Sequence, residues 1–299
     1  MVTAKLPTGW QEAGFTAYDP GEPRSRALVL SGGGATGIAW ESGYLMGLRE
    51  GGVDVRTADT VIGTSAGSVV GAHLRIGRDD EQALREITET PALRGMGRWG
   101  LLDATRFAVA QVAPEARTGR ALLGRAALHA RTMTEAEWLA IVAAPLRDQP
   151  WPEQRLLITA VDALTGISVV FDKNAGVSLE RAVAASCTVP GFFPPVEIKG
   201  RRYIDGGMRS IANIDLAQGH ERVLTLAPFP VAVRRKNRPG QQLAALGTQV
   251  RRHLAYPDKA SRRAMGLNPF DMRRTLATFE AALVQGRSAA PRLAELWHD

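Results

Sequence analysis

Three short glycine-containing motifs hold the residues whose types and spacing could do chemistry. They are GGGATG at residues 32–37, GTSAG at residues 63–67 and DGG at residues 205–207. The second has the GxSxG pattern, in which a serine stands on a sharp turn between a strand and a helix. A serine hydroxyl becomes a nucleophile when a neighbouring base accepts its proton, and an aspartate can be that base. The motifs therefore predict attack of a serine on an acyl carbon.

Ser65 is the candidate nucleophile. The run TVIG at residues 60–63 is short, apolar and typical of a buried strand, and the residues from Ala66 onward have helical spacing. Ser65 would therefore lie at a helix N-terminus, where the helix dipole and free amides, notably that of Ala66, favour negative charge. Gly63 and Gly67 would let the strand and the helix approach each other without side-chain collision.

The glycine-rich loop at residues 32–37 has three interpretations. It follows the apolar run at 26–31 and fits the dinucleotide fingerprint GxGxxG, with Asp54 or Asp59 as a ribose ligand about twenty residues on. It also fits a strip of bare amides that would stabilise an oxyanion, and a tight turn without chemistry is the third interpretation. Because a dinucleotide enzyme has no need of a serine elbow, the GTSAG motif favours an oxyanion hole. The candidate oxyanion-hole residues are Gly32, Gly33, Gly34, Gly37 and Ala66.

Asp205 is the candidate base, and Gly206 and Gly207 follow it in a tight turn. An aspartate before two glycines is by itself most often an ordinary turn. The three motifs together, however, are expected by chance in fewer than about one chain in a thousand of this composition. A triad in the order Ser65, Asp205 and His220 is the alternative to a dyad. We favour the dyad because the candidate nucleophile follows only the second detectable strand, whereas several strands precede it in α/β-hydrolases.

The elements that must position these motifs predict an α/β protein. Near the first two motifs, short apolar strands alternate with helical segments, which favours a mostly parallel sheet with helices on its faces. Strand-like runs return at 155–164 and 167–171, separated by a Thr-Gly turn that suits a hairpin. A second hairpin is expected to turn near Lys199 and Gly200 and to end at the DGG motif.

Composition excludes several classes of protein. With 299 residues, 45% of them apolar and 22% charged, the chain is long enough for one large domain and is neither disordered nor fibrous. None of its charge-free apolar stretches approaches the ~18 residues of a membrane-spanning helix. Residues 1–14 have no apolar segment of the kind found in secretory leaders, and the single Cys187 cannot form an internal disulfide. We therefore expect a cytoplasmic protein.

Positive charge is concentrated in the segment 230–275. Eleven basic and two acidic residues give this segment a local charge of +9, whereas the whole chain carries +7. Such a block favours nucleic acid, an anionic membrane surface or an acidic partner, or is simply a solvated face. It holds no recognisable nucleic-acid reading motif, so no nucleic acid is expected. We expect a peripheral contact with anionic lipid on the inner face of the membrane.

The sequence resembles the bacterial patatin-like phospholipases. The resemblance rests on SGGGATGIAWESGYLMGL (31–48), IGTSAGSVVGA (62–72), RAVAASCTVPGFFPPVEI (181–198) and YIDGG (203–207). It implies that Ser65 is the nucleophile, that Asp205 is its base, and that the glycine-rich loop supplies oxyanion-hole amides. The sequence departs from the family at Thr36, where an arginine or lysine is usual.

The resemblance also implies a fold and a function. The fold is a three-layer patatin-type α/β fold with a catalytic core at 24–230. Composition and helical spacing, rather than the resemblance, predict a helical insertion at about 81–150 and a basic, mainly helical region at 231–299 packed on the core. The function is hydrolysis of fatty-acyl carboxylic esters of phospholipids, lysophospholipids or related lipids through an acyl-enzyme. We expect no cofactor and no metal, because His, Asp and Glu nowhere have metal-ligand spacing. The alternatives are a catalytically weak lipid-binding or regulatory protein and a dinucleotide-binding oxidoreductase.

Overall fold

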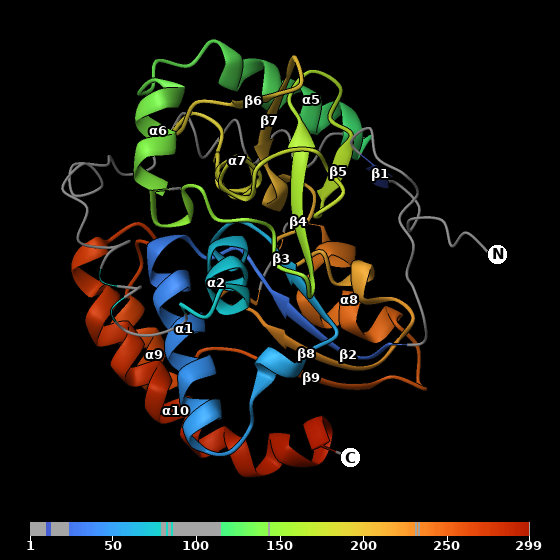
Figure 1. Ribbon diagram of the computed structural model, residues 1–299, viewed down its shortest axis with the longest axis vertical. Coiled ribbons are helices and arrows are strands. Elements are labelled where there is room, and N and C mark those ends of the chain that lie inside the picture. Colours follow the sequence, from blue (N-terminus) through green and yellow to red (C-terminus); the bar gives the residue numbers. More distant parts are fainter. Residues whose placement is uncertain are drawn as a thin grey trace.

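The protein is an α/β structure in which one sheet lies between layers of helices (Figure 1). The computed structural model describes residues 10–12, 24–78, 115–142, 144–230 and 234–298, with the single positions 82, 85 and 232. Much of the helical insertion expected at 81–150 lies outside these described residues. The part of it that is described is helical, and the predicted α/β class is confirmed.

The sheet has the strand order β1-β5-β4-β3-β2-β8-β9, and the hairpin of β6 and β7 joins it at β4. The strands are β1 (Trp10–Glu12), β2 (Arg24–Leu30), β3 (Thr60–Gly63), β4 (Arg155–Asp162), β5 (Ser168–Phe171), β6 (Val196–Ile198), β7 (Arg201–Asp205), β8 (His220–Leu226) and β9 (Arg251–Ala255). The pairs β1–β5, β2–β3, β2–β8, β3–β4 and β8–β9 are parallel, so the expectation of a mostly parallel sheet is confirmed. Both expected hairpins, β4–β5 and β6–β7, are present.

The pairing register places the first two motifs at one edge of the sheet. Leu30 of β2 is paired with Gly63 of β3 and with Leu226 of β8. These three parallel strands therefore end at the same level, and the loops that follow β2 and β3 leave the sheet side by side. Ligand sites of parallel sheets lie outside the carboxyl ends of the strands, which is this edge.

The register of β4 brings the third motif to the same place. β4 pairs with β5 along one edge, while β3 and then β7 pair along the other. Gly63 of β3 is paired with Ile158, and Asp205 of β7 is paired with Ala160, two residues further along β4. Since β7 is antiparallel to β4, its C-terminal end points back toward the end of β3. Asp205 therefore lies directly beyond the strand that leads to Ser65.

Helices cover both faces of the sheet, and the pleat of β2 shows why. The α-helices are α1 (Gly34–Glu50), α2 (Ala66–Arg75), α5 (Ala116–Leu128), α6 (Glu135–Val142), α7 (Leu179–Ser186), α8 (Pro239–Ala245), α9 (Lys259–Met265) and α10 (Thr275–His298). Alternate residues of a strand face opposite sides. Leu28 and Leu30 belong to the core under α1, α2, α7 and α10, whereas Ala27 and Val29 pack under α8 and the 3₁₀-helix η5 (Ile214–Ala217).

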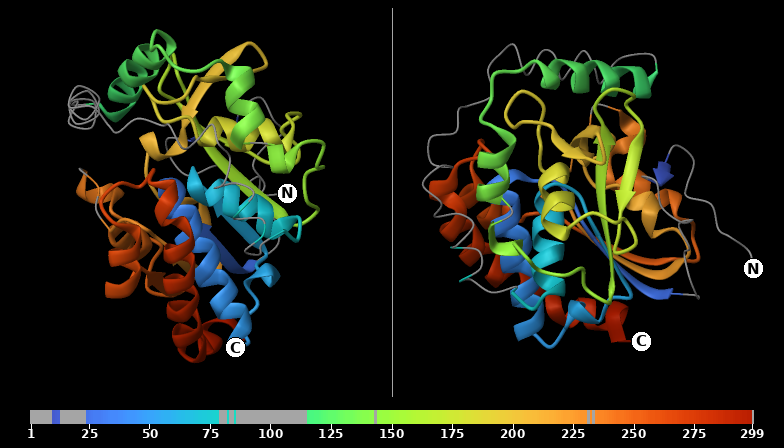
Figure 2. Two further views of the ribbon diagram at one scale, coloured as in Figure 1. Left: turned by 90° about the vertical axis from the view of Figure 1, so that its left-hand side faces the viewer. Right: turned by 45° about the horizontal axis from the view of Figure 1, so that its top comes forward.

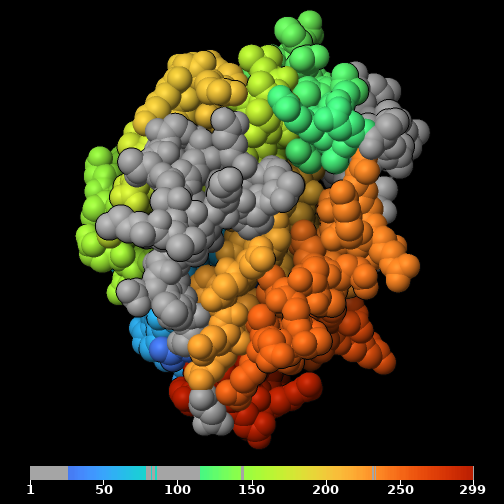
Figure 3. All heavy atoms as spheres, turned by 90° about the vertical axis from the view of Figure 1, so that its right-hand side faces the viewer, coloured from blue at the N-terminus to red at the C-terminus, as the bar shows by residue number. Residues whose placement is uncertain are grey.

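Helix α10 lies in backbone contact with α1 (Figure 2). A Cβ on Gly47 would lie 2.2 Å from the Leu283 carbonyl oxygen, and a Cβ on Gly286 would lie 2.2 Å from the Tyr44 carbonyl oxygen. Glycines on both helices are therefore needed for this close packing. Figure 3 shows the orange part of the C-terminal region, around α8, forming much of another face of the molecule.

Among the described residues, the helices are all too short or too polar to cross a lipid bilayer.

Candidate active site

The turn between β3 and α2 holds Ser65 in a strained backbone conformation. Its φ of 52° and ψ of −119° lie in a region that non-glycine residues rarely occupy, at a cost of about 1–3 kcal/mol. A Cβ on Gly63 would lie 2.6 Å from the Ser68 Cα. A Cβ on Gly67 would lie 2.1 Å from the Leu30 carbonyl oxygen. Glycine is therefore required on both sides of Ser65, because α2 starts in contact with the ends of β2 and β3.

Hydrogen bonds hold the Ser65 backbone in this conformation. Its amide donates to Ser186 Oγ at 2.9 Å. Its carbonyl oxygen accepts from Ser68 Oγ at 2.7 Å and from Cys187 Sγ at 3.3 Å. Burial raises the pKa of the Cys187 thiol, so the sulfur stays protonated as a donor.

Asp205 is buried at the end of β7, with 2% of its surface exposed. Its amide donates to the Thr188 carbonyl oxygen at 3.0 Å, and its Oδ1 accepts from the Gly207 amide at 2.7 Å. The Ser65 side chain is hydrogen-bonded to the same carboxyl group. Burial raises the pKa of Asp205 to about 7, while the hydrogen bonds from Ser65 and Gly207 act to lower it. The structure thus brings the Ser65 side chain close enough to Asp205 to influence its pKa.

The glycine after Asp205 leaves room for β4. A Cβ on Gly206 would lie 2.2 Å from Thr159 Oγ1, so any side chain at this position would push the DGG turn off the strand. The position of Gly206 therefore requires glycine for close packing. Gly207 has a different role, because its amide donates to the Asp205 carboxylate.

The structure corrects the list of candidate oxyanion-hole amides. The Gly32 amide donates to the Ile211 carbonyl oxygen at 2.7 Å. The Gly37 amide donates to the Gly33 carbonyl oxygen at 3.0 Å, because Gly37 already lies inside the first turn of α1. Including these two residues was therefore wrong.

The other three amides remain candidates. Within the described part of the chain, the amides of Gly33, Gly34 and Ala66 have no acceptor, as is usual at helix N-termini. Gly34 and Ala66 line the same cavity as Ser65. A Cβ on Gly33 would lie 2.6 Å from the Gly37 Cα, so an alanine there would reshape the loop as well as its amides.

A C-terminal loop covers the glycine-rich loop at Thr36. Thr36 is buried, and its amide donates to the Pro269 carbonyl oxygen at 3.0 Å. Gly34 has a φ of +62°, and a Cβ there would lie 2.7 Å from the same oxygen. The position that usually carries a basic side chain is thus packed against the region that follows α9.

An apolar cavity opens beside Ser65. Its walls include the side chains of Trp138, Phe193 and Phe270. The rings of Trp138 and Phe193 stack with centroids 3.8 Å apart, and Phe270 stacks on Phe192 at 5.5 Å. The cavity holds about 70 Å³, which is small for a ligand pocket, and its apolar lining suits a few methylene groups of a hydrocarbon chain.

His220 does not belong to this site. Its Nδ1 is 3.0 Å from the Ala217 carbonyl oxygen and its Nε2 is 3.0 Å from Thr60 Oγ1. Both His220 and Thr60 stand at the starts of their strands. Because β8 is seven residues long, His220 lies about 20 Å from the edge that holds Ser65. The Ser65–Asp205–His220 triad is therefore excluded.

The acidic residues of the dinucleotide interpretation are also at the wrong edge. Asp54 caps the 3₁₀-helix η1 (Val55–Thr57), and Asp59 accepts from the Arg26 amide at 2.8 Å. Both precede β3, so they lie at the amino ends of the strands, the length of α1 away from the glycine-rich loop. A nucleotide bound at that loop could not reach them. Among the described residues, no group of three His, Cys, Asp or Glu side chains could hold a metal ion.

The fold and the site define an α/β protein with a serine elbow and an adjoining buried aspartate. Residues 28–217 match the family described as patatin-like phospholipase. The chain belongs to the patatin-like phospholipase family.

Its relatives include proteins without a characterised activity. The chain is 31% identical over 184 residues to an uncharacterized NTE family protein of Mycobacterium bovis (strain ATCC BAA-935 / AF2122/97) and to one of Mycobacterium tuberculosis (strain CDC 1551 / Oshkosh). The match covers 61% of this chain and 42% of each relative, so the chain spans about two fifths of their length. The crystal structure of VipD from Legionella pneumophila is similar with a TM-score of 0.42 and 14% identity, over 97% of this chain and 71% of that one.

The raised pKa of Asp205 predicts a pH-dependent stability. In the unfolded chain this carboxyl ionises near pH 4, but in the fold it keeps its proton until about pH 7. The native state therefore binds an extra proton between about pH 4 and 7, and its stability falls as pH rises through that range. Asp205→Asn should gain stability relative to wild type between pH 5 and pH 8, measured by urea unfolding.

Ser65→Ala provides the matched comparison for this measurement. It removes a hydrogen bond that lowers the pKa of Asp205, so the decline in stability should extend to higher pH. A stability difference between Asp205→Asn and wild type that stays constant from pH 5 to 8 would show that the fold does not raise the pKa of the Asp205 carboxyl.

Proposed function

We propose that this protein is a serine hydrolase that cleaves fatty-acyl carboxylic esters of phospholipids or lysophospholipids. The observation that carries the proposal is the placement of Ser65, on a strained turn between β3 and α2, beside the buried Asp205. The apolar cavity beside Ser65 supports an acyl chain as the group that is bound. Membership of the patatin-like phospholipase family supports a lipid as the substrate.

In the proposed reaction, Ser65 Oγ attacks the ester carbonyl carbon while Asp205 takes the hydroxyl proton. The tetrahedral intermediate expels the alcohol, which leaves with the proton from Asp205, and the acyl group stays on Ser65. Water then attacks the acyl-enzyme with Asp205 again as base, which releases the fatty acid and restores the serine. A pKa of about 7 makes Asp205 a far better base near neutral pH than an ordinary aspartate.

The negative charge of the intermediate would be stabilised by backbone amides. Gly33 and Gly34 begin α1, Ala66 begins α2, and both helix N-termini present positive dipole ends. Amides aimed at an oxyanion typically contribute about 2.7–4 kcal/mol each to the transition state. Burial of the site strengthens them, because the surroundings are apolar.

A catalytically weak lipid-binding or regulatory protein is the second candidate function. The observation that favours it is Thr36, which packs under Pro269 where the family usually has a basic residue. Such a protein would bind lipid at the same cavity without turnover.

Three substitutions separate these functions. Folded Ser65→Ala should lose turnover of a p-nitrophenyl acyl ester, and Asp205→Asn should lose about 10²-fold or more, because both remove a reacting group. His220→Ala should keep most of the activity, since His220 lies at the far edge of the sheet. The assay is the initial rate at saturating ester, with circular dichroism as the control for folding.

Undiminished turnover by Ser65→Ala would contradict the hydrolase proposal. A loss in His220→Ala as large as that in Asp205→Asn would contradict the dyad. Wild-type protein that binds a fatty-acyl ester without hydrolysing it would support the second candidate.

We also propose that the basic C-terminal region contacts anionic lipid through one part of the segment 230–275. The exposed Arg262 and Arg263 of α9 flank the loop whose Pro269 covers the glycine-rich loop. In the same loop Leu267 is fully exposed, at 103%. Arg251 and Arg252 are exposed as well, but they start β9 and lie at the opposite edge of the sheet.

This arrangement predicts which charges matter for vesicle binding. Each basic residue near an anionic surface contributes on the order of 1 kcal/mol. Neutralising Arg262 and Arg263 to Gln should therefore weaken binding to phosphatidylglycerol vesicles by more than about tenfold. The attraction should also fade as the Debye length falls from ~10 Å at 0.1 M salt to ~3 Å at 1 M. Co-sedimentation measures both effects.

The matched control replaces Arg251 and Arg252 by Gln, and it should bind like wild type. Equal losses in the two variants would show a diffuse charge effect. Binding to phosphatidylcholine as tight as to phosphatidylglycerol, or no binding to either, would contradict the membrane role.

A further inference from the structure

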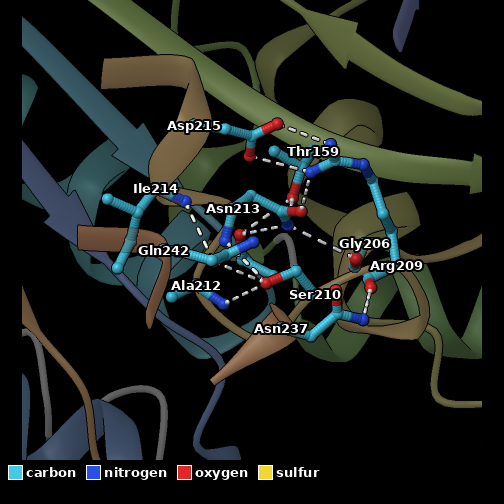
Figure 4. Close-up of polar contacts among 11 residues, drawn as sticks. Thr159, Gly206, Arg209, Ser210, Ala212, Asn213, Ile214, Asp215, Asn237 and Gln242 are labelled. Atoms are coloured by element: carbon cyan, nitrogen blue, oxygen red, sulfur yellow. Dashed lines mark hydrogen bonds and ion pairs between the residues drawn. The ribbon is translucent and has the colours of Figure 1, made fainter. Parts of the chain in front are cut away.

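A buried polar network joins the loop of Ser65 to the loop of Asp205, and Asn213 lies at its centre (Figure 4). Asn213 is fully buried between the 3₁₀-helices η4 (Gly206–Met208) and η5. Its Nδ2 is 3.0 Å from Thr64 Oγ1, 3.2 Å from Thr159 Oγ1 and 3.4 Å from the Gly206 carbonyl oxygen.

The acceptors of this amide stand next to the two reacting residues. Thr64 precedes Ser65 and Gly206 follows Asp205. Thr159 lies on β4 between them, and its hydroxyl is 2.9 Å from that of Thr64. Because β3 and β7 do not pair with each other, the two loops are joined through β4, through residues 186–188 at the end of α7, and through this amide.

The orientation of the Asn213 amide is fixed from its other side. Its Oδ1 accepts from Arg209 Nη1 at 3.0 Å, and a guanidinium can only donate. Arg209 is itself held by two hydrogen bonds to Asp215, at 2.9 Å and 2.5 Å. The amide nitrogen must therefore point at the oxygens of the two loops.

The backbone of Asn213 suits this role. Its φ of 49° is in the left-handed region, which asparagine enters more readily than most side chains. The conformation turns the chain so that a residue beyond the DGG motif returns its side chain to that motif, as Figure 4 shows for Asn213 and Gly206.

We propose that Asn213 is a positioning residue that keeps the Ser65 hydroxyl within hydrogen-bond reach of Asp205. The inference rests on the proposed function for its kinetic consequences. A two-residue site has no imidazole between nucleophile and base, so small displacements of either loop act directly on the proton transfer. A misplacement of about 1 Å can cost 10²-fold in rate. Asn213 acts through Thr64 and Gly206 and does not touch the reacting atoms.

The test uses Asn213→Gly, which keeps the left-handed backbone and removes the amide. It should lower kcat by about tenfold to 10²-fold while KM for the ester changes less than about twofold, because binding in the apolar cavity is untouched. Asn213→Asp keeps the size of the side chain but cannot donate to the three oxygens when it is ionised. It should therefore also lower kcat while KM changes little.

A second readout does not depend on turnover. A looser Ser65 hydrogen bond should raise the pKa of Asp205, as measured from the pH dependence of unfolding with Asp205→Asn as the reference. The matched control is Asn237→Ala, which removes a 2.8 Å hydrogen bond to the Arg209 carbonyl oxygen on the same loop. It should leave both the pKa and kcat near wild type.

Two outcomes would overturn the proposal. One is a pKa of Asp205 in Asn213→Gly equal to that in Asn237→Ala, since the Gly variant adds no charge near the carboxyl. The other is a loss of kcat matched by the control, which would indicate general destabilisation. A wild-type protein without ester turnover would refute the proposed function alone, since the pKa measurement would still decide whether Asn213 holds the two loops together.

Discussion

The close approach of α2 to the carboxyl end of β2 is the constraint on which the rest of the structure depends. The Gly67 amide donates to the Ser31 carbonyl oxygen at 3.1 Å, and any Cβ at this position would collide with Leu30. To reach that contact from β3, the chain has to turn within two residues, and this forces Ser65 into its positive φ. The strain is compensated by two hydrogen bonds: the Ser65 amide donates to Ser186 Oγ of α7, and the Ser65 carbonyl oxygen accepts from Ser68 Oγ of α2. The same turn leaves the Ser65 side chain at the edge of the sheet, facing the end of β7.

Burial of Asp205 has two opposing consequences. It destabilises the fold above neutral pH, because an ionised carboxylate is held away from water. It also raises the pKa into the range in which a base works near neutrality, which an exposed aspartate could not reach. The fold offsets part of this cost through the Gly207 amide and the Ser65 hydroxyl. Stability is thus reduced at the point where the proposed chemistry needs reactivity.

Local sequence patterns predicted the strands, helices and turns around the site, but they did not predict the long-range contacts. TVIG, the GTSAG turn and the DGG turn each act over a few residues, so spacing alone indicated a strand-turn-helix elbow and a tight turn. The hydrogen bonds of the Gly32 amide to Ile211 and of the Thr36 amide to Pro269 join segments far apart in the sequence, and no periodicity reports them. Thr159 interrupts an apolar run, which is a weak signal of a buried polar contact. Asn213 stands between Ala212 and Ile214 in a segment that mixes polar and apolar residues without a regular period, and it gave no such signal.

The most direct measurement of the central claim is labelling of the protein with a fluorophosphonate, followed by mass-spectrometric mapping of the modified residue. A fluorophosphonate reacts with a serine whose proton is accepted by a base, so the label should appear on Ser65 and be lost in Ser65→Ala. Asp205→Asn should label far more slowly although it keeps the serine. Modification at another residue, or equal labelling of wild type and Ser65→Ala, would contradict the account.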